Sequence, residues 1–269
     1  MIKLLKRPKK SLGQNFLIDK NIINKILAIA KLDQRKVVLE IGAGYGNLTE
    51  AIASTKPKKI YAVEKDKKLA LLLKKKFKDY KNIQIINDDI LNIIEKKSFN
   101  ENLTVLGNLP YNISTKILAS LITLKKWPPW YESLIFMFQK EVADRILAKV
   151  KTKEYGRLSV LSNWRLEIKK HFNISPNSFF PRPKIDSTLL SFNPKKDILI
   201  NLKNPKNLEK ITQILFSNRR KMINKNLSKL FKNVPLISES LKINLTMRPE
   251  ELNNETFYKM AREYEKLND

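Results

Sequence analysis

The chain has 269 residues, of which 42% are hydrophobic, so it is long enough to bury a core of its own. Its 53 Lys and Arg residues outnumber its 26 Asp and Glu residues, which gives a formal net charge of +27. A field of this sign attracts polyanions, and phosphate backbones are the commonest of them. The chain is also rich in Lys, Asn and Ile, as products of AT-rich genomes are, so the charge serves only as support for nucleic-acid binding.

The residue inventory excludes several kinds of chemistry. Without cysteine, the chain can form no disulfide, no thiolate zinc site and no cysteine nucleophile. With His171 as its one histidine, it is a poor candidate for a catalytic triad or a multi-histidine metal site. No apolar run reaches the roughly 20 residues of a membrane helix, and no apolar stretch follows the basic residues 1–10 as a secretory signal requires. We therefore expect a cytoplasmic protein without a metal or a membrane segment.

The predicted elements alternate along the first part of the chain. Asp19 is a candidate N-cap for a first helix over 22–30. Short apolar runs rich in β-branched and aromatic residues predict strands, and apolar residues three and four apart predict the helices between them. Strands are expected at 37–41, 60–63, 83–86, 103–106, 134–138 and 185–192, and helices at 69–77, 115–124 and 142–150. This alternation is typical of an α/β domain in which helices cover both faces of a parallel sheet.

The pattern changes near Pro194. Prolines and paired aromatic residues interrupt it from residue 176 onward. Beyond residue 195 only helices are predicted, over 208–216, 222–231 and 257–267. We therefore predict two domains, of residues 1–194 and of residues 195–269.

A glycine-rich turn follows the first strand of the predicted sheet. The sequence EIGAGYG at 40–46 has the spacing G-x-G-x-G. Glycines are needed where the backbone approaches a ligand closely and takes conformations that a Cβ atom forbids. The dinucleotide fingerprint is G-x-G-x-x-G, so this spacing, with Glu40 ahead of the first glycine, favours S-adenosylmethionine over a nicotinamide dinucleotide. An ordinary tight turn is the alternative for this motif taken alone.

Acidic residues end the next two predicted strands. Glu64 lies 22 residues after Gly42, close to the ~20 expected for a carboxylate that binds ribose hydroxyls. Asp88 and Asp89 follow the third strand, where a carboxylate can accept from an adenine amino group. A surface charge or a helix cap would explain each acid singly. Because parallel strands bring their carboxyl ends to one edge of the sheet, a common ligand site is the stronger interpretation.

The fourth predicted strand ends in Asn108-Leu109-Pro110-Tyr111. The exocyclic amine of adenine is a poor nucleophile because its lone pair is delocalised into the ring. The Asn108 oxygen and the backbone carbonyl before the proline can accept the two amine hydrogens and stabilise the positive charge that develops. Tyr111 can stack on a base taken out of its helix. An ordinary turn is the alternative for this tetrapeptide taken alone.

Several segments resemble the ribosomal RNA adenine N6,N6-dimethyltransferase family, and the likeness covers nearly the whole chain. They are SLGQNFL at 11–17, EIGAGYG at 40–46, NLPYNIST at 108–115 and FFPRPKIDS at 179–187. The sequence FSNRRK at 216–221 resembles the KsgA-type branch, which modifies two adjacent adenines near the 3′ end of small-subunit RNA. The resemblance implies a Rossmann-like S-adenosylmethionine-dependent methyltransferase domain with a small all-helical C-terminal domain.

The resemblance also implies roles for individual residues. For the cofactor these are Asn15 and Leu17 at its methionine part, Gly42 in the turn, Glu64 at the ribose, Asp89 and Ile90 at the adenine, and Asn108. For the target base they are Asn108, Leu109, Pro110, Tyr111 and Phe179, with Phe179 facing Tyr111 across the flipped adenine. Asp89 is preferred to Asp88 because it is in register with the family's aspartate.

Two basic clusters are candidates for RNA contact. The first consists of Lys3, Lys6, Arg7, Lys9 and Lys10, and the second of Arg219, Arg220, Lys221, Lys225 and Lys229. The last three lysines are four residues apart and would share a helix face. A solvated charged surface is the alternative for either cluster, but phosphate contact is favoured where a base-modifying site accompanies it. The expected partners are small-subunit ribosomal RNA and the assembling small subunit, and the protein is expected to be a monomer.

Two other functions fit parts of the pattern. One is that of the large-subunit RNA adenine methyltransferases that confer macrolide resistance, against which Leu109 and the segment at 219–221 argue. The other is that of a non-catalytic nucleic-acid-binding factor on the same scaffold, against which the intact Glu64, Asp89 and Asn108 argue. The predicted activity is therefore dimethylation of adenine N6 in small-subunit ribosomal RNA during ribosome biogenesis, with S-adenosylmethionine as methyl donor.

Overall fold

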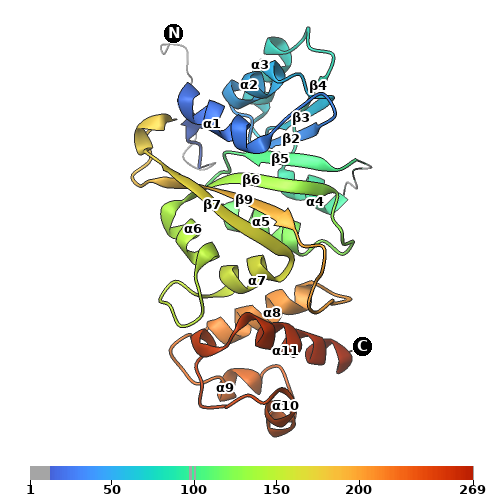
Figure 1. The fold of residues 1–269 in the computed structure, drawn as a ribbon, viewed down its shortest axis with the longest axis vertical. Helices are drawn as coiled ribbons and strands as arrows, with labels where there is room; N and C mark the ends of the chain where they lie inside the picture. Colours follow the sequence, from blue (N-terminus) through green and yellow to red (C-terminus); the bar gives the residue numbers. More distant parts are fainter. Residues whose placement is uncertain (1–12, 97–98, 100, 269) are drawn as a thin grey trace. The chain divides into compact units, whose positions relative to one another are not determined.

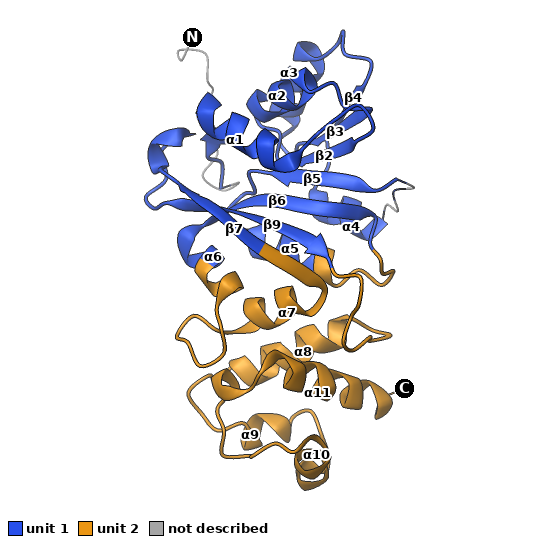
Figure 2. Ribbon diagram, in the orientation of Figure 1, with its two compact units in different colours: residues 1–120, 129–143, 169–194 blue, residues 121–128, 144–168, 195–269 orange. Residues whose placement is uncertain are grey.

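The computed structural model describes residues 13–96, 99 and 101–268, and the chain divides into two compact units. Unit 1 comprises residues 1–120, 129–143 and 169–194, and unit 2 comprises residues 121–128, 144–168 and 195–269 (Figure 2). The predicted boundary after Pro194 coincides with the start of the last segment of unit 2, but unit 2 also includes two earlier segments. The division into domains of residues 1–194 and 195–269 stays a prediction. Within the described ranges, no helix has the length and apolar character needed to cross a membrane.

A seven-stranded sheet with the strand order β4-β3-β2-β5-β6-β9-β7 organises unit 1 (Figure 1). The strands β2 to β6 pair in parallel, and β9 pairs antiparallel to β6. The direction of chain progression reverses between β2 and β5, which is where open α/β sheets bind ligands. The strands are β2 Val37–Ile41, β3 Lys59–Val63, β4 Ile83–Ile86, β5 Leu103–Gly107, β6 Tyr131–Gln139, β7 Leu166–Ile174 and β9 Ser187–Pro194.

The hydrophobic runs in the sequence became strands because the sheet is covered on both faces. Every residue of β2 and of β5 is buried, as expected for parallel strands between two helical layers. All six predicted strands are present. The strand β7 was not predicted, because only its two end residues are buried and Lys169 and Lys170 occupy exposed positions. Such a weak apolar pattern is typical of an edge strand protected by charge.

The helices of unit 1 begin and end at residues that suit their ends. The Asp19 carboxylate accepts from the backbone amides of Asn21 and Ile22, which confirms the predicted N-cap, and Asp66 caps α3 in the same way. Figure 1 shows α4 and α5 on the opposite side of the sheet from α1 and α2. The helices are α1 Lys20–Ala30, α2 Asn47–Ser54, α3 Lys67–Lys76, α4 Ile90–Lys96, α5 Ser114–Ile122 and α6 Lys140–Leu147.

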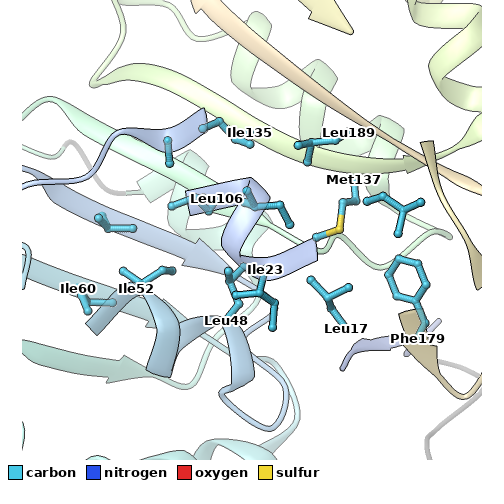
Figure 3. Close-up of a cluster of buried hydrophobic side chains, with 14 residues drawn as sticks. Leu17, Ile23, Leu48, Ile52, Ile60, Leu106, Ile135, Met137, Phe179 and Leu189 are labelled. Carbon is cyan, nitrogen blue, oxygen red and sulfur yellow. The ribbon is translucent and has the colours of Figure 1, made fainter. Parts of the chain in front are cut away.

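The largest described core cluster of unit 1 lies between the sheet and helices α1 and α2. Ile23 of α1 and Leu48 of α2 pack against strand residues such as Leu106 (Figure 3). Leu17 and Phe179 belong to the same cluster, with 4% and 3% of their surfaces exposed. They lie on two short strands, β1 (Phe16–Leu17) and β8 (Phe179–Phe180), which pair antiparallel. Burial of each such side chain stabilises the fold by roughly 1.5–3 kcal/mol, so the start of the described chain is firmly attached to a segment far along the sequence.

Unit 2 is built mainly from helices. The Tyr258 hydroxyl of α11 donates to the Val160 carbonyl of α7 at 3.0 Å, and Glu265 accepts from the backbone amides of Lys203 and Asn204. The helices predicted at 208–216 and 257–267 are confirmed, and α10 was not predicted. The helices are α7 Arg157–Arg165, α8 Lys206–Phe216, α9 Asn224–Leu227, α10 Val234–Leu241 and α11 Asn254–Lys266.

The prediction of a helix over 222–231 is wrong, since only Asn224–Leu227 is α-helical. The Ile223 amide donates to the Met247 carbonyl at 2.9 Å, and this hydrogen bond is not part of an α-helix. Asn226 is buried, and its side chain donates to the Leu215 carbonyl at 3.2 Å. Tertiary hydrogen bonds therefore override the apolar spacing in this segment.

Candidate active site

A pocket lies in unit 1 at the carboxyl ends of β2, β3, β4 and β5. It encloses about 810 Å³ of space, part of it open to solvent. The strand ends and the N-terminal segment at 13–16 provide its walls. The lining residues are Gly13, Gln14, Asn15, Phe16, Ile41, Gly42, Val63, Glu64, Lys65, Asp88, Asp89, Ile90, Asn108, Pro110, Asn112 and Ile113.

The glycine-rich turn needs each of its three glycines. Gly42, Gly44 and Gly46 have φ values of +76°, +58° and +79°, in the left-handed region. A Cβ atom on Gly44 would lie 2.7 Å from the ring of Phe16, and one on Gly46 would lie 2.8 Å from Leu73. The turn thus brings bare backbone to the pocket wall, where Gly42 lines it.

Glu64 links the end of β3 to this turn. Its carboxylate accepts from the Gly44 amide at 2.9 Å and from the Asp66 amide at 2.7 Å. Burial raises the pKa of Glu64 above its ordinary value, although these hydrogen bonds oppose the change. Each carboxylate oxygen has a second lone pair, so Glu64 can hold the turn and still accept from hydroxyl groups of a ligand.

Glu40 is a buried acid behind the pocket and is not among its lining residues. The Thr49 hydroxyl donates to its Oε2 atom at 2.6 Å. Burial raises the pKa of Glu40 to about 8, and the nearby charge of Glu64 adds to the effect. Burial therefore favours the uncharged form of the Glu40 side chain.

The two adjacent carboxylates after β4 have different partners. Asp89 accepts from the Lys65 ammonium at 2.8 Å and from the Leu91 amide at 3.0 Å, whereas Asp88 accepts from the side chain of Asn92 at 2.9 Å. Burial raises the pKa of Asp89. The hydrogen bonds from Lys65 and Leu91 together lower it by a larger amount, so the net pKa lies below its usual value. Both acids line the pocket, and Asp89 is half-buried while Asp88 is exposed. This difference favours Asp89 as the residue that meets a ligand.

Asn108 offers an unused acceptor at the pocket. Its Nδ2 atom donates to the Asn15 carbonyl at 2.5 Å, which fixes the orientation of the amide. Its Oδ1 atom is buried and accepts no hydrogen bond from any described residue. An unsatisfied buried acceptor costs about 1–3 kcal/mol, and a donor on a bound ligand can satisfy this atom.

Not every predicted site residue lines the pocket. Tyr111 is half-buried, its hydroxyl lies 2.6 Å from the Ser187 hydroxyl oxygen, and burial raises its pKa. Leu109 is buried. Leu17 is buried as well, and its backbone carbonyl accepts a hydrogen bond from the side chain of Asn47 at 2.9 Å. Phe179 packs in the core beside Leu17 (Figure 3). Stacking of Phe179 on a base would require its ring to be uncovered, and this role stays a prediction.

Several lining residues were missed by the sequence-based prediction. Gly13, Gln14 and Phe16 belong to the segment at 11–17 that carries the family resemblance, so that motif held the signal. Phe16 packs edge-on against Tyr45, with ring centroids 4.5 Å apart. Lys65 belongs to no motif, and its place in the pocket could be found only from the structure.

The predicted RNA contacts of the second basic cluster lie in unit 2. Arg220, Lys221, Lys225 and Lys229 line one groove together with Arg248, although the short α9 does not give the three lysines a common helix face. Arg219 differs, because it pairs with Glu250 at 2.6 Å and donates to the Thr152 carbonyl at 2.9 Å. The other groove residues are Asn218, Met222, Asn224, Asn226, Thr246 and Glu251.

The remaining expectations concern the N-terminal basic cluster, metal binding and the histidine. The first basic cluster, of Lys3, Lys6, Arg7, Lys9 and Lys10, and the motif residues Ser11 and Leu12 lie outside the described residues. In the described ranges, no three acidic or histidine side chains form a cluster that could hold a metal ion. His171 shares a 2.8 Å hydrogen bond with Ser191, and burial lowers its pKa.

Comparison with known proteins identifies the family. A family model described as Ribosomal RNA adenine dimethylase matches residues 5–266. Ribosomal RNA small subunit methyltransferase A of Pelagibacter ubique (strain HTCC1062) is 52% identical over 261 residues, covering 97% of this chain and 98% of that protein. The protein of the same name from Wolbachia pipientis wMel is 40% identical, covering 99% and 92%. The crystal structure of a dimethyladenosine transferase from Plasmodium falciparum has a TM-score of 0.75 at 26% identity, covering 94% of this chain and 98% of that one. The chain therefore belongs to the ribosomal RNA adenine dimethylase family of S-adenosylmethionine-dependent methyltransferases.

Proposed function

We propose that this protein transfers methyl groups from S-adenosylmethionine to the N6 amines of two adjacent adenines near the 3′ end of small-subunit ribosomal RNA, forming N6,N6-dimethyladenosine. The observation that carries the proposal is the unpaired Oδ1 atom of Asn108 at the pocket. The names of relatives that are 52% and 40% identical support small-subunit RNA as the substrate. We further propose that the protein acts as a monomer on assembling small subunits in the cytoplasm.

The residues of the pocket fit S-adenosylmethionine. When bound, this cofactor supplies an electrophilic methyl group. Glu64 would accept from the ribose hydroxyls, and Asp89 would accept from the adenine amino group while Ile90 contacts the ring. The segment with Asn15 and Leu17, together with the backbone at Gly42 and the side chain of Asn108, would hold the methionine part. Of these residues, all but Leu17 line the pocket.

The end of β5 would activate the target amine. Asn108 Oδ1 and the Leu109 carbonyl accept the two amine hydrogens, and their hydrogen bonds strengthen as the nitrogen becomes cationic. In the described chain, the Leu109 carbonyl accepts no other hydrogen bond, and Pro110 has no N–H to compete for an acceptor. After the first transfer the amine retains one hydrogen, for which one acceptor suffices. No strong base is required, because the amine loses its proton once it is cationic.

The target base would be fixed by stacking on Tyr111. The hydrogen bond between Tyr111 and Ser187 holds the ring, so its orientation is set before a base arrives. Phe179 is proposed as the second aromatic surface. Phosphates of the RNA would be held by Arg220, Lys221 and Lys225, whose groove in unit 2 also contains Lys229 and Arg248. Arg219 would add to this field, although its guanidinium is engaged with Glu250.

The decisive experiment is methyl transfer from labelled S-adenosylmethionine to under-methylated 30S particles and, in parallel, to 50S precursors. We expect label in N6,N6-dimethyladenosine of the 30S particle alone. Label in the 50S precursor would instead support the large-subunit alternative. Cofactor binding without transfer to either particle would support the non-catalytic alternative.

We expect Glu64→Ala to weaken cofactor binding by about 10- to 100-fold, because hydrogen bonds to a charged group contribute about 1.5–3 kcal/mol each. Isothermal titration calorimetry measures the affinity, and thermal unfolding checks that the variant is folded. Glu50→Ala is the matched control, since it removes a carboxylate from an ion pair with Lys76 on the surface of α2. Unchanged affinity in folded Glu64→Ala would refute the ribose assignment.

We expect the triple variant Arg220→Glu, Lys221→Glu and Lys225→Glu to bind 30S precursors more weakly and with a flatter salt dependence. Each lost phosphate contact lowers the slope of log affinity against log salt by ~0.7–0.9. The control reverses Lys149, Lys206 and Lys232, which are exposed in unit 2 but do not line the groove. Cofactor affinity should stay constant in both proteins. Equal particle binding by the two variants at every salt concentration would show that the groove is only a solvated surface.

A further inference from the structure

Lys65 lines the pocket and pairs with the carboxylate of Asp89. It follows Glu64 at the end of β3, and its ammonium lies 2.8 Å from Asp89 Oδ2. The Asn87 side chain donates to the carbonyls of Glu64 at 2.8 Å and of Lys65 at 3.2 Å, which fixes the end of β3 against the end of β4. The position of the Lys65 backbone is therefore fixed, and its side chain extends from the end of β3 to Asp89.

The carboxylate of Asp89 is held at both oxygens. Oδ1 accepts from the Leu91 amide at 3.0 Å, and Oδ2 accepts from Lys65. Two donors on different atoms fix the plane of a carboxylate, and each oxygen keeps a further lone pair. Because both Lys65 and Asp89 line the pocket, a lone pair of Asp89 remains available to a donor on a ligand.

We propose that Lys65 is a positioning residue for recognition of the cofactor's adenine. Its ammonium orients the Asp89 carboxylate, so that Asp89 accepts from the exocyclic amino group. The proposal rests on the proposed function in one respect, namely that an adenosyl cofactor occupies this pocket.

An exposed ion pair without function is the alternative. The Lys65 side chain is 57% exposed, which by itself fits that view, but Asp89 is only 20% exposed. Exposed pairs between flexible side chains contribute little, because solvent and salt screen them. Here Asp89 is half-buried and a backbone amide holds its Oδ1 atom, so Lys65 supplies the second donor that fixes the plane of the carboxylate.

The test compares ligands with and without the group that Asp89 would recognise. The ligands are S-adenosylhomocysteine and its analogue with hydrogen in place of the 6-amino group, titrated by calorimetry. Lys65→Met keeps the aliphatic stem and removes the charge, and Lys65→Arg restores the charge. Lys67→Met is the matched control, because Lys67 is exposed and does not line the pocket.

We expect wild type and Lys67→Met to bind the amino compound on the order of 10-fold more tightly than the analogue, as one hydrogen bond to a charged group predicts. Lys65→Met should lose most of this preference, and Lys65→Arg should keep most of it. At saturating cofactor, the rate of methyl transfer to 30S particles should be equal in Lys65→Met and wild type, because the effect lies on binding and therefore on KM.

Two results would overturn the proposal. One is an unchanged preference for the amino compound in Lys65→Met, which would make the pair a surface feature. The other is the absence of any preference in wild type, which would show that the adenine amino group is not recognised here. Failure of the proposed function would look different, since wild type would then bind S-adenosylhomocysteine normally but transfer no methyl group to 30S particles.

Discussion

Replacement of Asn108 by alanine is expected to slow methyl transfer in a single turnover by about 10²–10³-fold, the usual effect of losing one preorganised transition-state contact. The reason is that Oδ1 accepts a bond that strengthens as the amine becomes cationic. The measurement is the rate of label transfer to a stoichiometric amount of under-methylated 30S particles at saturating cofactor. Particle affinity, measured separately, should remain close to that of wild type.

The control for this prediction is Asn102→Ala. Asn102 precedes β5 and is exposed, whereas Asn108 follows the same strand at the pocket. The two changes therefore remove the same carboxamide group from opposite ends of β5. Asn108→Ala also removes the bond to the Asn15 carbonyl, and a cofactor titration shows how much of the loss comes from that segment. Transfer at the wild-type rate in Asn108→Ala would disprove the acceptor role.

Tyr111→Ala is expected to reduce activity by about 5- to 150-fold, because stacking of a base on an aromatic ring is worth ~1–3 kcal/mol. Tyr111→Phe keeps the ring and should retain most activity. It loses the hydrogen bond to Ser187, which stabilises the fold by about 0.5–1.5 kcal/mol. Single-turnover transfer and thermal unfolding, measured together on each variant, separate the two effects.

Ser187→Ala provides the matched control for Tyr111→Phe. It removes the same hydrogen bond from the other side and leaves the tyrosine ring in place, and Ser187 is itself fully buried in β9. The two variants should therefore show similar losses of stability and similar retention of activity. If Tyr111→Phe were as inactive as Tyr111→Ala, the hydroxyl and not the ring would be the functional group.

The parts of the site that could be predicted from the sequence are those at the ends of parallel strands. Short, mostly apolar runs such as 37–41 and 103–106 locate the strands, and parallel pairing brings their carboxyl ends to one edge. Glu64, Asp89 and Asn108 each follow such a run, and the structure places all three on one pocket. Their convergence on one edge could be predicted because periodicity and chain direction are local properties of the sequence.

Other features depend on contacts that a sequence does not display. The pairing of β1 with β8 joins two-residue strands, which are too short to produce a periodic signal. The charge of Arg219 is visible in the sequence, but its ion pair with Glu250 is a tertiary contact. The same holds for Lys65 and Asp89, whose link depends on the register between β3 and β4.

The pairing of β1 with β8 has a consequence for the time at which the protein becomes functional during its own synthesis. The pocket wall at residues 13–16 is attached to Phe179 and Phe180. At ~5–20 residues per second, these partners are translated on the order of 10–30 s after the wall itself. A nascent chain thus holds the glycine turn and the acids of the strand ends well before the pairing of β1 with β8 can form. The newly made protein gains this support for its pocket wall only when the ribosome has passed the end of β8.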